Sequence, residues 1–175
     1  MNHRKPRDPP LGSLSLYNKD TKMYQPVTLD SSYWYYRISV NMYDTFTDSF
    51  APSPGKASLV STVFVGDVFD NSTGIKVGTF QSAGVSTVLR ADLTLQYLAT
   101  TGIELGPNGD DAIFTQVALD GANFAEKVAD LDLAILGGTG QYKGATGDVR
   151  YTGTQVTKPD NLYVLEMAVP RFKRF

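Results

Sequence analysis

The sequence predicts an all-β protein whose strands form an eight-stranded antiparallel β-barrel, with an antiparallel sandwich as the alternative. Two observations support this fold class. Apolar and polar residues alternate with a period of two through several short segments, which is typical of half-buried strands. Clusters of glycine, proline, asparagine and aspartate separate these segments and favour the tight turns of hairpins. Eight strands make a barrel whose interior is filled by side chains or by one small ligand.

Residues 1–30 are expected to form an N-terminal arm in front of a single barrel domain, residues 31–175. The first ten residues are mostly polar or charged and contain three prolines, a composition typical of disorder. Residues 11–30 carry more apolar side chains, so part of this stretch is expected to pack on the barrel. Both a loosely attached arm and a lid over the barrel mouth fit this pattern.

The first strand is expected over residues 33–44, where the alternation is clearest. One face carries Trp34, Tyr36, Ile38, Val40 and Met42. The other face carries Tyr35, Arg37, Ser39, Asn41 and Tyr43. Successive side chains of a strand point to opposite faces, so the first set should face the core. The turn residues PSPG at 52–55 then interrupt the chain.

Seven further strands follow, each bounded by turn residues. They are expected over residues 58–70, 75–90, 92–100, 112–121, 131–138, 144–157 and 162–170. Gly78 and Gly84 lie inside the long segment 75–90, where interior glycines suit bulges or sharp bends. Residues 123–131 fit either a helical turn or a loop. Residues 71–73 match a glycosylation acceptor pattern, but a turn is the preferred interpretation.

The composition excludes several classes of site. The chain has no cysteine, so thiolate metal ligands and cysteine nucleophiles are absent. Its one histidine, His3, lies in the polar arm, so neither a histidine-based triad nor a multi-histidine metal site is expected. A formal net charge of −2 gives no basic field that would recruit nucleic acid. We therefore expect no metal, no cofactor and no nucleic acid.

No apolar run approaches the roughly 20 residues of a membrane helix, and no secretory signal pattern follows the first residues. The expectation is a cytoplasmic protein that does not bind a membrane. A signal peptide removed from the chain would instead make it secreted.

The glycine-rich stretch LGGTGQYKGATGDV, residues 136–149, is the most distinctive local feature. A dinucleotide fingerprint needs G-x-G-x-x-G at the start of a helix. Here the third glycine is missing and the flanking segments are strands, so a nucleotide site is not expected. Gly138 and Gly140 are instead expected to form a tight turn, where positive φ and close backbone approach require glycine.

The stretch Ile135–Gly147 resembles the allene oxide cyclase barrel superfamily, which includes plant dirigent proteins. A strand ends in GGTG, an aromatic follows two residues later, and a glycine pair precedes the next strand. A weaker match lies at 66–84, and the resemblance covers about residues 33–170. It implies a calycin-like barrel that works without metal or organic cofactor on a mostly apolar ligand. Members include cyclases of fatty-acid epoxides, bacterial cyclases that perform [4+2] cycloaddition, and dirigent proteins that steer phenolic radical coupling.

The chain departs from true allene oxide cyclases at their functional positions. Arg37 and Ser39 stand where those enzymes carry a glutamate and an asparagine, and their catalytic cysteine aligns near Ser86. The jasmonate-pathway reaction is therefore not expected. The aspartate of dirigent proteins has no counterpart in the first strand other than Asp44.

Charges within apolar strands mark candidate sites, because burying an unpaired charge is costly. Arg37 and Glu166 lie mid-strand in the first and last strands, which are antiparallel neighbours in a closed up-and-down barrel. They are placed either to pair across this seam or to point outward into solvent or a subunit contact. The alternation places Arg37 outside the barrel, whereas the resemblance places it inside.

With Arg37 inside, the candidate catalytic residues are Arg37, Glu166 and Asn41. The candidate substrate-binding residues are Trp34, Tyr36, Phe64, Tyr97, Tyr163 and Met167. Each of these is also a plausible filler of the barrel core.

The first functional hypothesis is a cofactor-independent cyclase or isomerase that folds a hydrophobic, unsaturated substrate inside the barrel, in secondary metabolism. The alternative is a non-catalytic, dirigent-like protein that orients or binds a small apolar or phenolic ligand. A structural barrel without a pocket is the third. A homo-oligomer, dimer or trimer, is expected because exposed aromatics such as Tyr33 and Tyr35 would otherwise leave an apolar patch.

Overall fold

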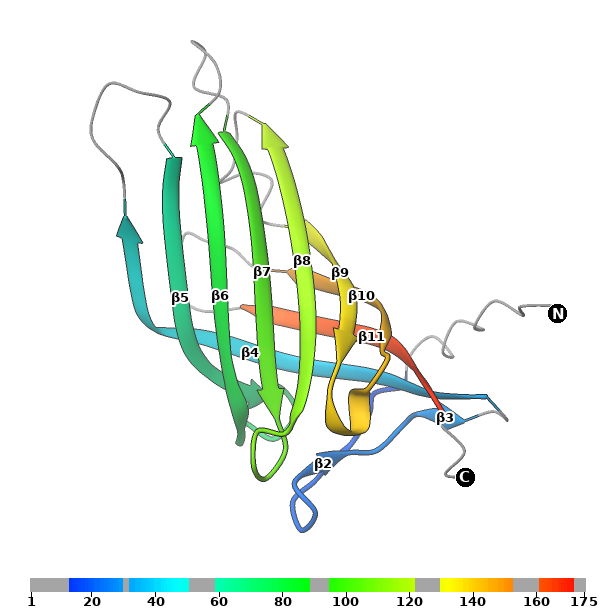
Figure 1. Cartoon of the computed structure of the whole chain (residues 1–175). Coiled ribbons are helices and arrows are strands. Elements are labelled where there is room, and N and C mark those ends of the chain that lie inside the picture. Colours follow the sequence, from blue (N-terminus) through cyan, green and yellow to red (C-terminus); the bar gives the residue numbers. More distant parts are fainter. Residues whose placement is uncertain are drawn as a thin grey trace, which may run out of the picture.

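Eight long strands follow one another along the chain, each antiparallel to the next (Figure 1). They are β4 (Tyr33–Phe50), β5 (Leu59–Asp70), β6 (Lys76–Val88), β7 (Leu95–Leu105), β8 (Asp111–Gly121), β9 (Asp130–Gly138), β10 (Thr146–Thr152) and β11 (Leu162–Pro170). This computed structural model describes residues 13–29, 32–50, 59–88, 95–121, 130–152 and 161–171. The expectations for residues 1–12 and for most of 123–131 lie outside the described residues.

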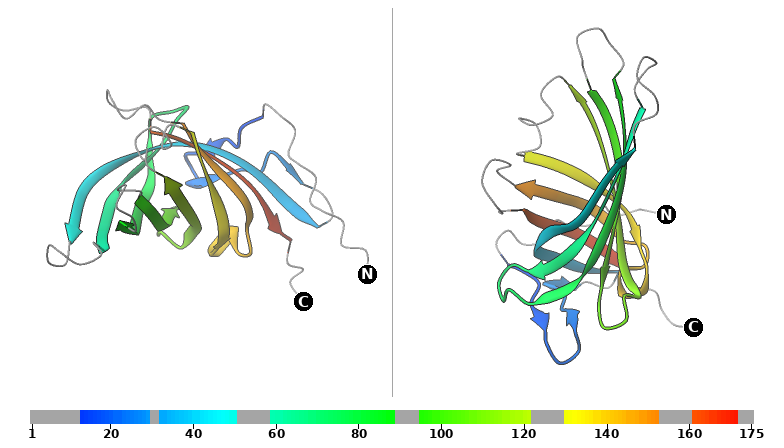
Figure 2. Two further views of the ribbon diagram at one scale, coloured as in Figure 1. Left: turned by 90° about the horizontal axis from the view of Figure 1, so that it is seen from above. Right: turned by 90° about the vertical axis from the view of Figure 1, so that its left-hand side faces the viewer.

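The sheet closes on itself through β4 and β11. The first half of β4 pairs with β11, from Tyr33 opposite Pro170 to Asn41 opposite Leu162. Its second half pairs with β5 from Val40 onward. Hydrogen-bonded neighbours therefore follow the chain from β4 to β11 and return to β4. The strands curve around a common interior (Figure 2), and the predicted closed eight-stranded barrel is confirmed.

The alternation along β4 separates the inside of the barrel from the outside, as predicted. Tyr36, Ile38, Val40 and Met42 are all at most 5% exposed and belong to the core cluster. The other strands add apolar side chains to the same cluster, among them Val68, Phe80, Ile103, Ile113, Ile135, Val149 and Leu165. One continuous core therefore fills much of the barrel.

A β-bulge lengthens β4 beyond its predicted end at Asp44. The ladder with β5 passes from Asp44 opposite Gly66 directly to Phe46 opposite Val65, so Thr45 is an extra residue. The phase of the alternation reverses there, which is why the period-two pattern stops at Asp44 although the strand continues. Phe46, which would point inward without the bulge, is 57% exposed.

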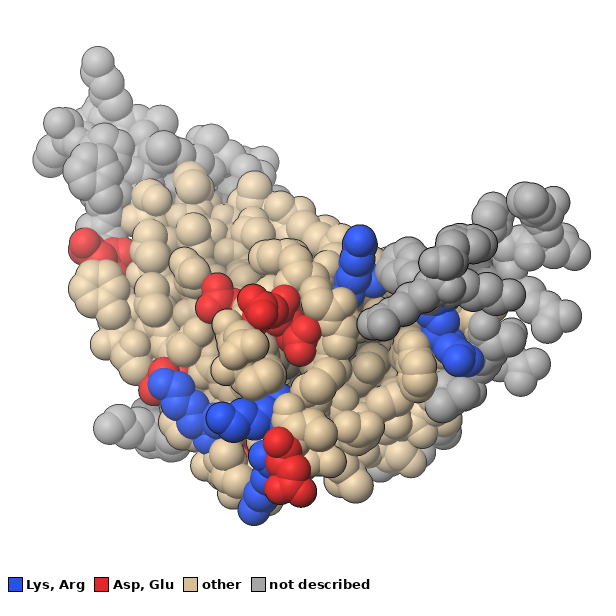
Figure 3. Space-filling model, turned by 60° about the horizontal axis from the view of Figure 1, so that its bottom comes forward, with Lys and Arg blue, Asp and Glu red and all other residues tan. Residues whose placement is uncertain are grey.

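The N-terminal arm, residues 13–29 in the structure, packs against the barrel through three short strands. β1 (Tyr17–Asn18) pairs with β2 (Met23–Tyr24), and β3 (Thr28–Leu29) pairs with the start of β4. Tyr24 is 2% exposed and joins the core cluster. Figure 3 shows the molecule turned so that the bottom of Figure 1 comes forward, with charged side chains gathered in patches on a mostly uncharged surface.

The turn between β5 and β6 is built around the carboxylate of Asp70. The hydroxyls of Ser72 and Thr73 donate hydrogen bonds to its Oδ1, each at 2.7 Å. The Tyr24 hydroxyl donates to its Oδ2 at 3.0 Å. The predicted turn at residues 71–73 is present, and the same carboxylate attaches the N-terminal arm to the barrel.

The glycine-rich turn contains the short helix η1 (Gly140–Tyr142), and the two glycines singled out from the sequence have different roles. Gly140 has a φ of 53°, and a Cβ there would collide with the Asp111 carboxylate. Gly138 lacks a left-handed φ, but the carbonyls of Ala112 and Tyr142 approach it too closely for a side chain. The structural interpretation of this motif is therefore supported at both positions.

The exposed apolar surface does not lie where the sequence suggested. Tyr35 is only 4% exposed, and β3 pairs with β4 at this residue, so an exposed patch centred on Tyr33 and Tyr35 is wrong. Most exposed large apolar side chains of the described residues instead lie along the outer face of β4 to β8, namely Phe46, Val63, Val65, Val85, Leu98 and Phe114. A homo-oligomer stays a prediction, with this outer face as its apolar surface. The part of the chain that is described contains no helix long and apolar enough to cross a bilayer.

Candidate functional site

A cavity of about 350 Å³ lies inside the barrel and is lined by residues from all eight barrel strands. It occupies the half that holds the end of β4 and the start of β5, where Asp44 and Phe64 face it. Tyr24 and Tyr142 belong to the core and are not part of its lining. Small-molecule pockets typically measure roughly 300–1,000 Å³, so this cavity suits one compact ligand.

Most of the cavity wall is apolar or aromatic. Met42, Phe64, Phe80, Val117 and Leu133 supply much of it. These side chains cannot satisfy charged groups, whereas they favour transfer of an apolar skeleton from water. The wall therefore selects a ligand that is mainly hydrocarbon or aromatic.

Four polar side chains gather on the side of the cavity formed by β4, β10 and β11: Asp44, Tyr151, Asn161 and Tyr163. The Tyr151 hydroxyl donates a hydrogen bond to Asn161 Oδ1 at 3.0 Å. The rings of Tyr151 and Tyr163 are 4.7 Å apart between centroids. These contacts fix the orientation of both tyrosines toward the same part of the cavity.

Burial shifts the acid–base behaviour of this polar cluster. Asp44 lies at the exposed rim, yet partial loss of hydration raises the pKa of its carboxyl above the usual value. Burial, followed by the charges of Tyr151 and Asp44, raises the pKa of Tyr163 well above its usual value. Burial and then Asp44 raise the pKa of Tyr151 as well. Both tyrosines therefore stay protonated and keep their hydroxyl donors near neutral pH.

The bulge in β4 makes Asp44 the end of the inner row. Because Thr45 is the extra residue, Asp44 is the last residue of the inward phase that begins at Trp34. The next residue in that phase would have been Phe46, which the bulge turns outward. The bulge thus ends an apolar inner row with a single carboxylate at the cavity rim.

A row of hydroxyls lines the cavity on the opposite strands. Ser82 of β6, Thr101 of β7 and Thr115 of β8 stand directly opposite one another in the ladders. All three face the cavity, and Thr101 donates a hydrogen bond to Ser82 Oγ at 2.9 Å. We call these three residues the hydroxyl row.

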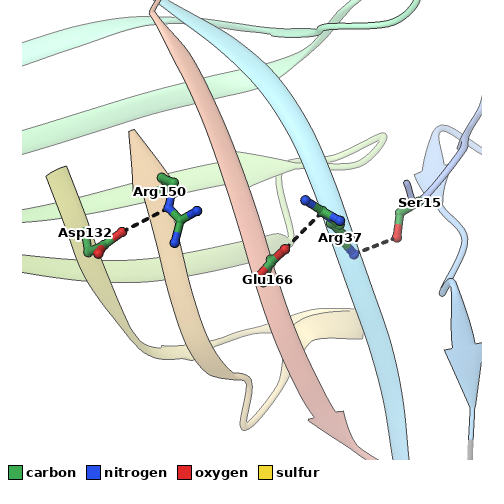
Figure 4. Close-up of polar contacts among 5 residues, drawn as sticks. All are labelled: Ser15, Arg37, Asp132, Arg150 and Glu166. Carbon is green, nitrogen blue, oxygen red and sulfur yellow. Dashed lines mark hydrogen bonds and ion pairs between the residues drawn. The ribbon is translucent and has the colours of Figure 1, made fainter. Parts of the chain in front are cut away.

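Arg37 and Glu166 form an ion pair on the outer face of the barrel, with Arg37 Nε 2.9 Å from Glu166 Oε1 (Figure 4). Figure 4 also shows Ser15 of the N-terminal arm, whose Oγ accepts the Arg37 backbone N–H at 3.0 Å. Of the two alternatives for these charges, both hold in part, because the residues pair across the seam and do so on the outer face. The proposed contact of these charges with a substrate inside the barrel is not supported, because neither residue lines the cavity.

The outer surface around this ion pair forms a separate charged groove of about 320 Å³. Asp132, Asp148 and Arg150 line it together with Arg37 and Glu166. Asn41, the third candidate catalytic residue, shares the outward phase of Arg37 on β4 and is also absent from the cavity lining. The alternation within β4 was thus the correct guide to orientation, and the alignment with the allene oxide cyclases was not.

Three of the six candidate wall residues line the cavity and three do not. Phe64, Tyr97 and Tyr163 line the cavity. Tyr36 and Met167 lie inside the barrel, at 5% and 2% exposure, but belong to the packed core beyond the cavity. Trp34 packs against that core, with the Arg171 guanidinium 4.8 Å from its ring centroid. Binding of a substrate by any of the six stays a prediction.

Sequence reasoning did not identify the hydroxyl row or Tyr151 as site residues. A signal was present, because Thr115 falls in the same phase of β8 as Ile113 and Val117. A threonine in an otherwise apolar inner row is a detectable anomaly. Tyr151 likewise shares the inward phase of Val149 on β10.

Comparison with known proteins finds relatives by structure alone. No protein-family model matches the chain, and no curated protein matches it. A solved pyocyanin demethylase aligns with a TM-score of 0.54 and 20% identity, over 75% of this chain and 98% of the other. A nonspecific heme-binding cyclase, described as catalysing [4 + 2] cycloaddition during neoabyssomicin biosynthesis, aligns with a TM-score of 0.55 and 19% identity, over 79% and 67%.

A third structure is the pterocarpan synthase dirigent protein GePTS1, with a TM-score of 0.53 and 15% identity, over 85% of this chain and 91% of that one. This chain shares the barrel fold of these proteins. The fold that the resemblance implied is therefore confirmed. Identities this low establish the fold only, because one barrel fold supports different chemistries.

Proposed function

We propose that the cavity binds a small, mostly apolar, unsaturated molecule and that the protein acts on it as a cofactor-independent cyclase or isomerase, in secondary metabolism. The observation that carries the proposal is the cavity itself: about 350 Å³ inside a closed barrel, apolar over a little more than half of its wall, with one carboxyl and two tyrosines converging on one side. A cyclase neighbour with the same fold supports the reaction class.

The apolar wall supplies the main catalytic effect in this proposal. Phe64, Phe80 and Leu133 face the cavity from different strands and restrict the shapes that a flexible polyene can adopt. Holding the reacting ends close together offsets up to roughly 7–11 kcal/mol of a barrier, because orientation entropy is lost on binding rather than in the reaction. In this proposal the apolar wall therefore favours a unimolecular ring closure.

The polar cluster supplies a hydrogen bond to the reacting system. Asp44 lines the cavity, and a carboxyl with a raised pKa stays protonated to higher pH than a solvated one, so we assign the role of acid to Asp44. Its proton, or the hydroxyl of Tyr163, polarises a carbonyl or epoxide oxygen and draws electron density from the neighbouring unsaturated bond. The acid form of Asp44 is lost as pH rises through its pKa, so the rate of turnover should fall as pH rises.

Binding is tested with N-phenyl-1-naphthylamine, whose fluorescence increases in apolar surroundings. Saturable binding is expected for the wild type. Ala99→Leu narrows the cavity from β7, because Ala99 faces it, and should weaken binding. Ala83→Leu is the matched control, since Ala83 is exposed and lies outside the cavity lining. Equal binding by both variants would show that the probe binds elsewhere.

Catalysis is tested with linear substrates that carry a conjugated diene and a tethered enone. Cyclisation gives a product of unchanged mass and altered retention, measured against the protein-free rate by liquid chromatography and mass spectrometry. Asp44→Asn keeps the side-chain size and removes the acid, and we expect it to slow turnover by about 10²-fold. An unchanged rate in Asp44→Asn would remove the acid from the mechanism while leaving the cavity proposal intact.

The alternative function is dirigent-like binding without catalysis, which the tyrosine-rich wall of Tyr97, Tyr151 and Tyr163 favours for a phenolic ligand. The dirigent neighbour shares the fold. Oxidative coupling of coniferyl alcohol by a one-electron oxidant, carried out in the presence of the protein, distinguishes the two functions. A dirigent-like protein changes the stereochemistry of the coupled dimers at an unchanged rate of radical formation, whereas a cyclase leaves these dimers racemic.

A further inference from the structure

The hydroxyl row contains one hydroxyl that the fold itself does not satisfy. Thr115 is 1% exposed, and its Oγ1 has no hydrogen-bond partner among the described residues. Nearly all buried polar groups in native proteins have a partner, so an exception calls for a physical reason. Thr115 also lines the cavity, and its Oγ1 presents almost no surface there, so its proton reaches a ligand by rotation of this side chain.

The neighbouring hydroxyl does not provide a proton to Thr115. Thr101 stands opposite Thr115 in the β7–β8 ladder, but it donates its only hydroxyl proton to Ser82 at 2.9 Å. No hydrogen bond from Thr115 to Thr101 occurs among the described residues. Native structures tolerate a buried acceptor without a partner better than a buried donor without one. The unmet requirement is therefore an acceptor for the Thr115 proton.

Packing does not explain the hydroxyl either. Along β8 the inward neighbours of Thr115 are Ile113 and Val117, both buried and apolar. Valine has the same shape as threonine and would fill this position without burying an unpaired polar group. A register shift between β8 and β9 lies beside Thr115, where β9 turns Leu136 outward to 57% exposure. The hydroxyl therefore costs folding free energy relative to a valine at this position.

We propose that Thr115 donates a hydrogen bond to an acceptor oxygen of the ligand, such as a ketone or other carbonyl oxygen, and so selects an apolar skeleton that carries this oxygen at the end bound against β7 and β8. The inference rests on the proposed function, because it requires a ligand in the cavity. It adds a second polar anchor across the cavity from Asp44, so a bound ligand is held in one direction. Thr115 is a specificity-determining residue in this role.

Two probes of nearly equal size test the proposal: 2-acetylnaphthalene, which carries a carbonyl oxygen, and 2-ethylnaphthalene, which does not. Calorimetry measures the affinity of each for the wild type, Thr115→Val and Thr115→Ser. We expect Thr115→Val to lower the affinity for 2-acetylnaphthalene about five- to ten-fold, which corresponds to the loss of one net hydrogen bond. The affinity for 2-ethylnaphthalene should not change. Thr115→Ser keeps the hydroxyl and should restore most of the preference.

Two further measurements separate this role from a structural one. The infrared carbonyl stretch of bound 2-acetylnaphthalene should lie at lower frequency in the wild type and Thr115→Ser than in Thr115→Val. The melting temperature of Thr115→Val should equal or exceed that of the wild type, because an unpaired buried hydroxyl is removed. Thr100→Val is the matched control, since Thr100 is the exposed neighbour of Thr101 on β7. This substitution should leave the affinity for both probes unchanged.

The possible failures are distinguishable. Equal weakening of both probes by Thr115→Val, or an unchanged carbonyl stretch, would overturn the role of Thr115 and leave the cavity as a binding site. Absence of saturable binding by either probe to the wild type would overturn the proposed function and this inference together.

Discussion

Arg37 and Glu166 are directly opposite each other across the β4–β11 seam that closes the barrel, and they form an ion pair of 2.9 Å on its outer face. Their side chains are 24% and 44% exposed. Water screens such pairs, and ordering two long side chains costs entropy, so pairs of this kind typically contribute about 0–1 kcal/mol. The two charges that stand out most in the sequence therefore lie apart from the cavity and contribute little to stability.

The first prediction follows from that location. Glu166→Gln should lower the free energy of unfolding by less than about 1 kcal/mol. It should leave binding of N-phenyl-1-naphthylamine unchanged, whereas Phe64→Ala, which alters the cavity wall, should weaken it. Urea denaturation and fluorescence titration measure the two effects. A loss of probe binding in Glu166→Gln comparable to that in Phe64→Ala would mean that the outer groove is the binding site.

Period-two reasoning predicted the strands and the inward face of β4 because burial of one face imposes that period on the sequence. The same period places Asp44 inward, but it could not show that the inner row ends there, since Thr45 shifts the phase with neither glycine nor proline among the bulged residues of β4. The sequence also could not predict which inward-facing residues fill the core and which line the cavity. Tyr36 and Tyr163 have similar sequence surroundings, and only the three-dimensional packing shows that Tyr163 meets open volume whereas Tyr36 meets Tyr142.

The second prediction concerns Gly84, which lies beneath the ring of Tyr97. A Cβ at Gly84 would overlap the Tyr97 ring and hydroxyl, and Tyr97 lines the cavity. Gly84→Ala should therefore displace this ring, cost about 1–3 kcal/mol through overpacking, and change the affinity for N-phenyl-1-naphthylamine.

Gly102→Ala is the matched control for this substitution. Its Cβ would meet only Phe114, at 3.7 Å, which is an ordinary contact. Replacing such a glycine reduces the entropy of the unfolded chain, so we expect a neutral effect or a gain of about 0.4–1 kcal/mol with unchanged probe affinity. Indistinguishable behaviour of the two variants would show that Tyr97 does not shape the cavity.

The third prediction is a pH dependence that originates at Asp70. Burial alone would raise the pKa of this carboxyl, but hydrogen bonds from Thr73, Ser72 and Tyr24 outweigh it and lower the pKa below its usual 3.8. A folded-state pKa below the unfolded one contributes stability above pH 3.8, and this contribution is lost as pH falls through the folded-state pKa.

Asp70→Asn should therefore be less stable than the wild type near neutral pH, by about 1.5–3 kcal/mol for hydrogen bonds to a charged group. The difference in melting temperature should shrink below about pH 4, where the wild-type carboxylate also becomes protonated. Asp132→Asn is the control, because Asp132 is 71% exposed in a weak ion pair with Arg150. A difference between Asp70→Asn and wild type that stays constant from pH 7 to pH 3 would contradict the assignment.

The fourth prediction compares two glycines that share a left-handed backbone but differ in surroundings. Gly74 and Gly140 have φ values of 67° and 53°. Nothing lies within 4 Å of a Cβ at Gly74, whereas a Cβ at Gly140 would collide with the Asp111 carboxylate. That carboxylate accepts the Gln141 backbone N–H at 2.9 Å, so its displacement breaks a charge-assisted hydrogen bond.

Gly74→Ala should therefore cost only the backbone strain, about 1–2 kcal/mol. Gly140→Ala should cost the same strain plus about 1.5–3 kcal/mol for the lost hydrogen bond to Asp111. Urea denaturation measures both, and Asp111→Asn in the Gly140→Ala background should cost less than in the wild type, because the two substitutions disturb one contact. Equal losses for the two alanine variants would show that the glycine-rich turn needs glycine for its φ alone, without any contribution from the packing of Asp111 against it.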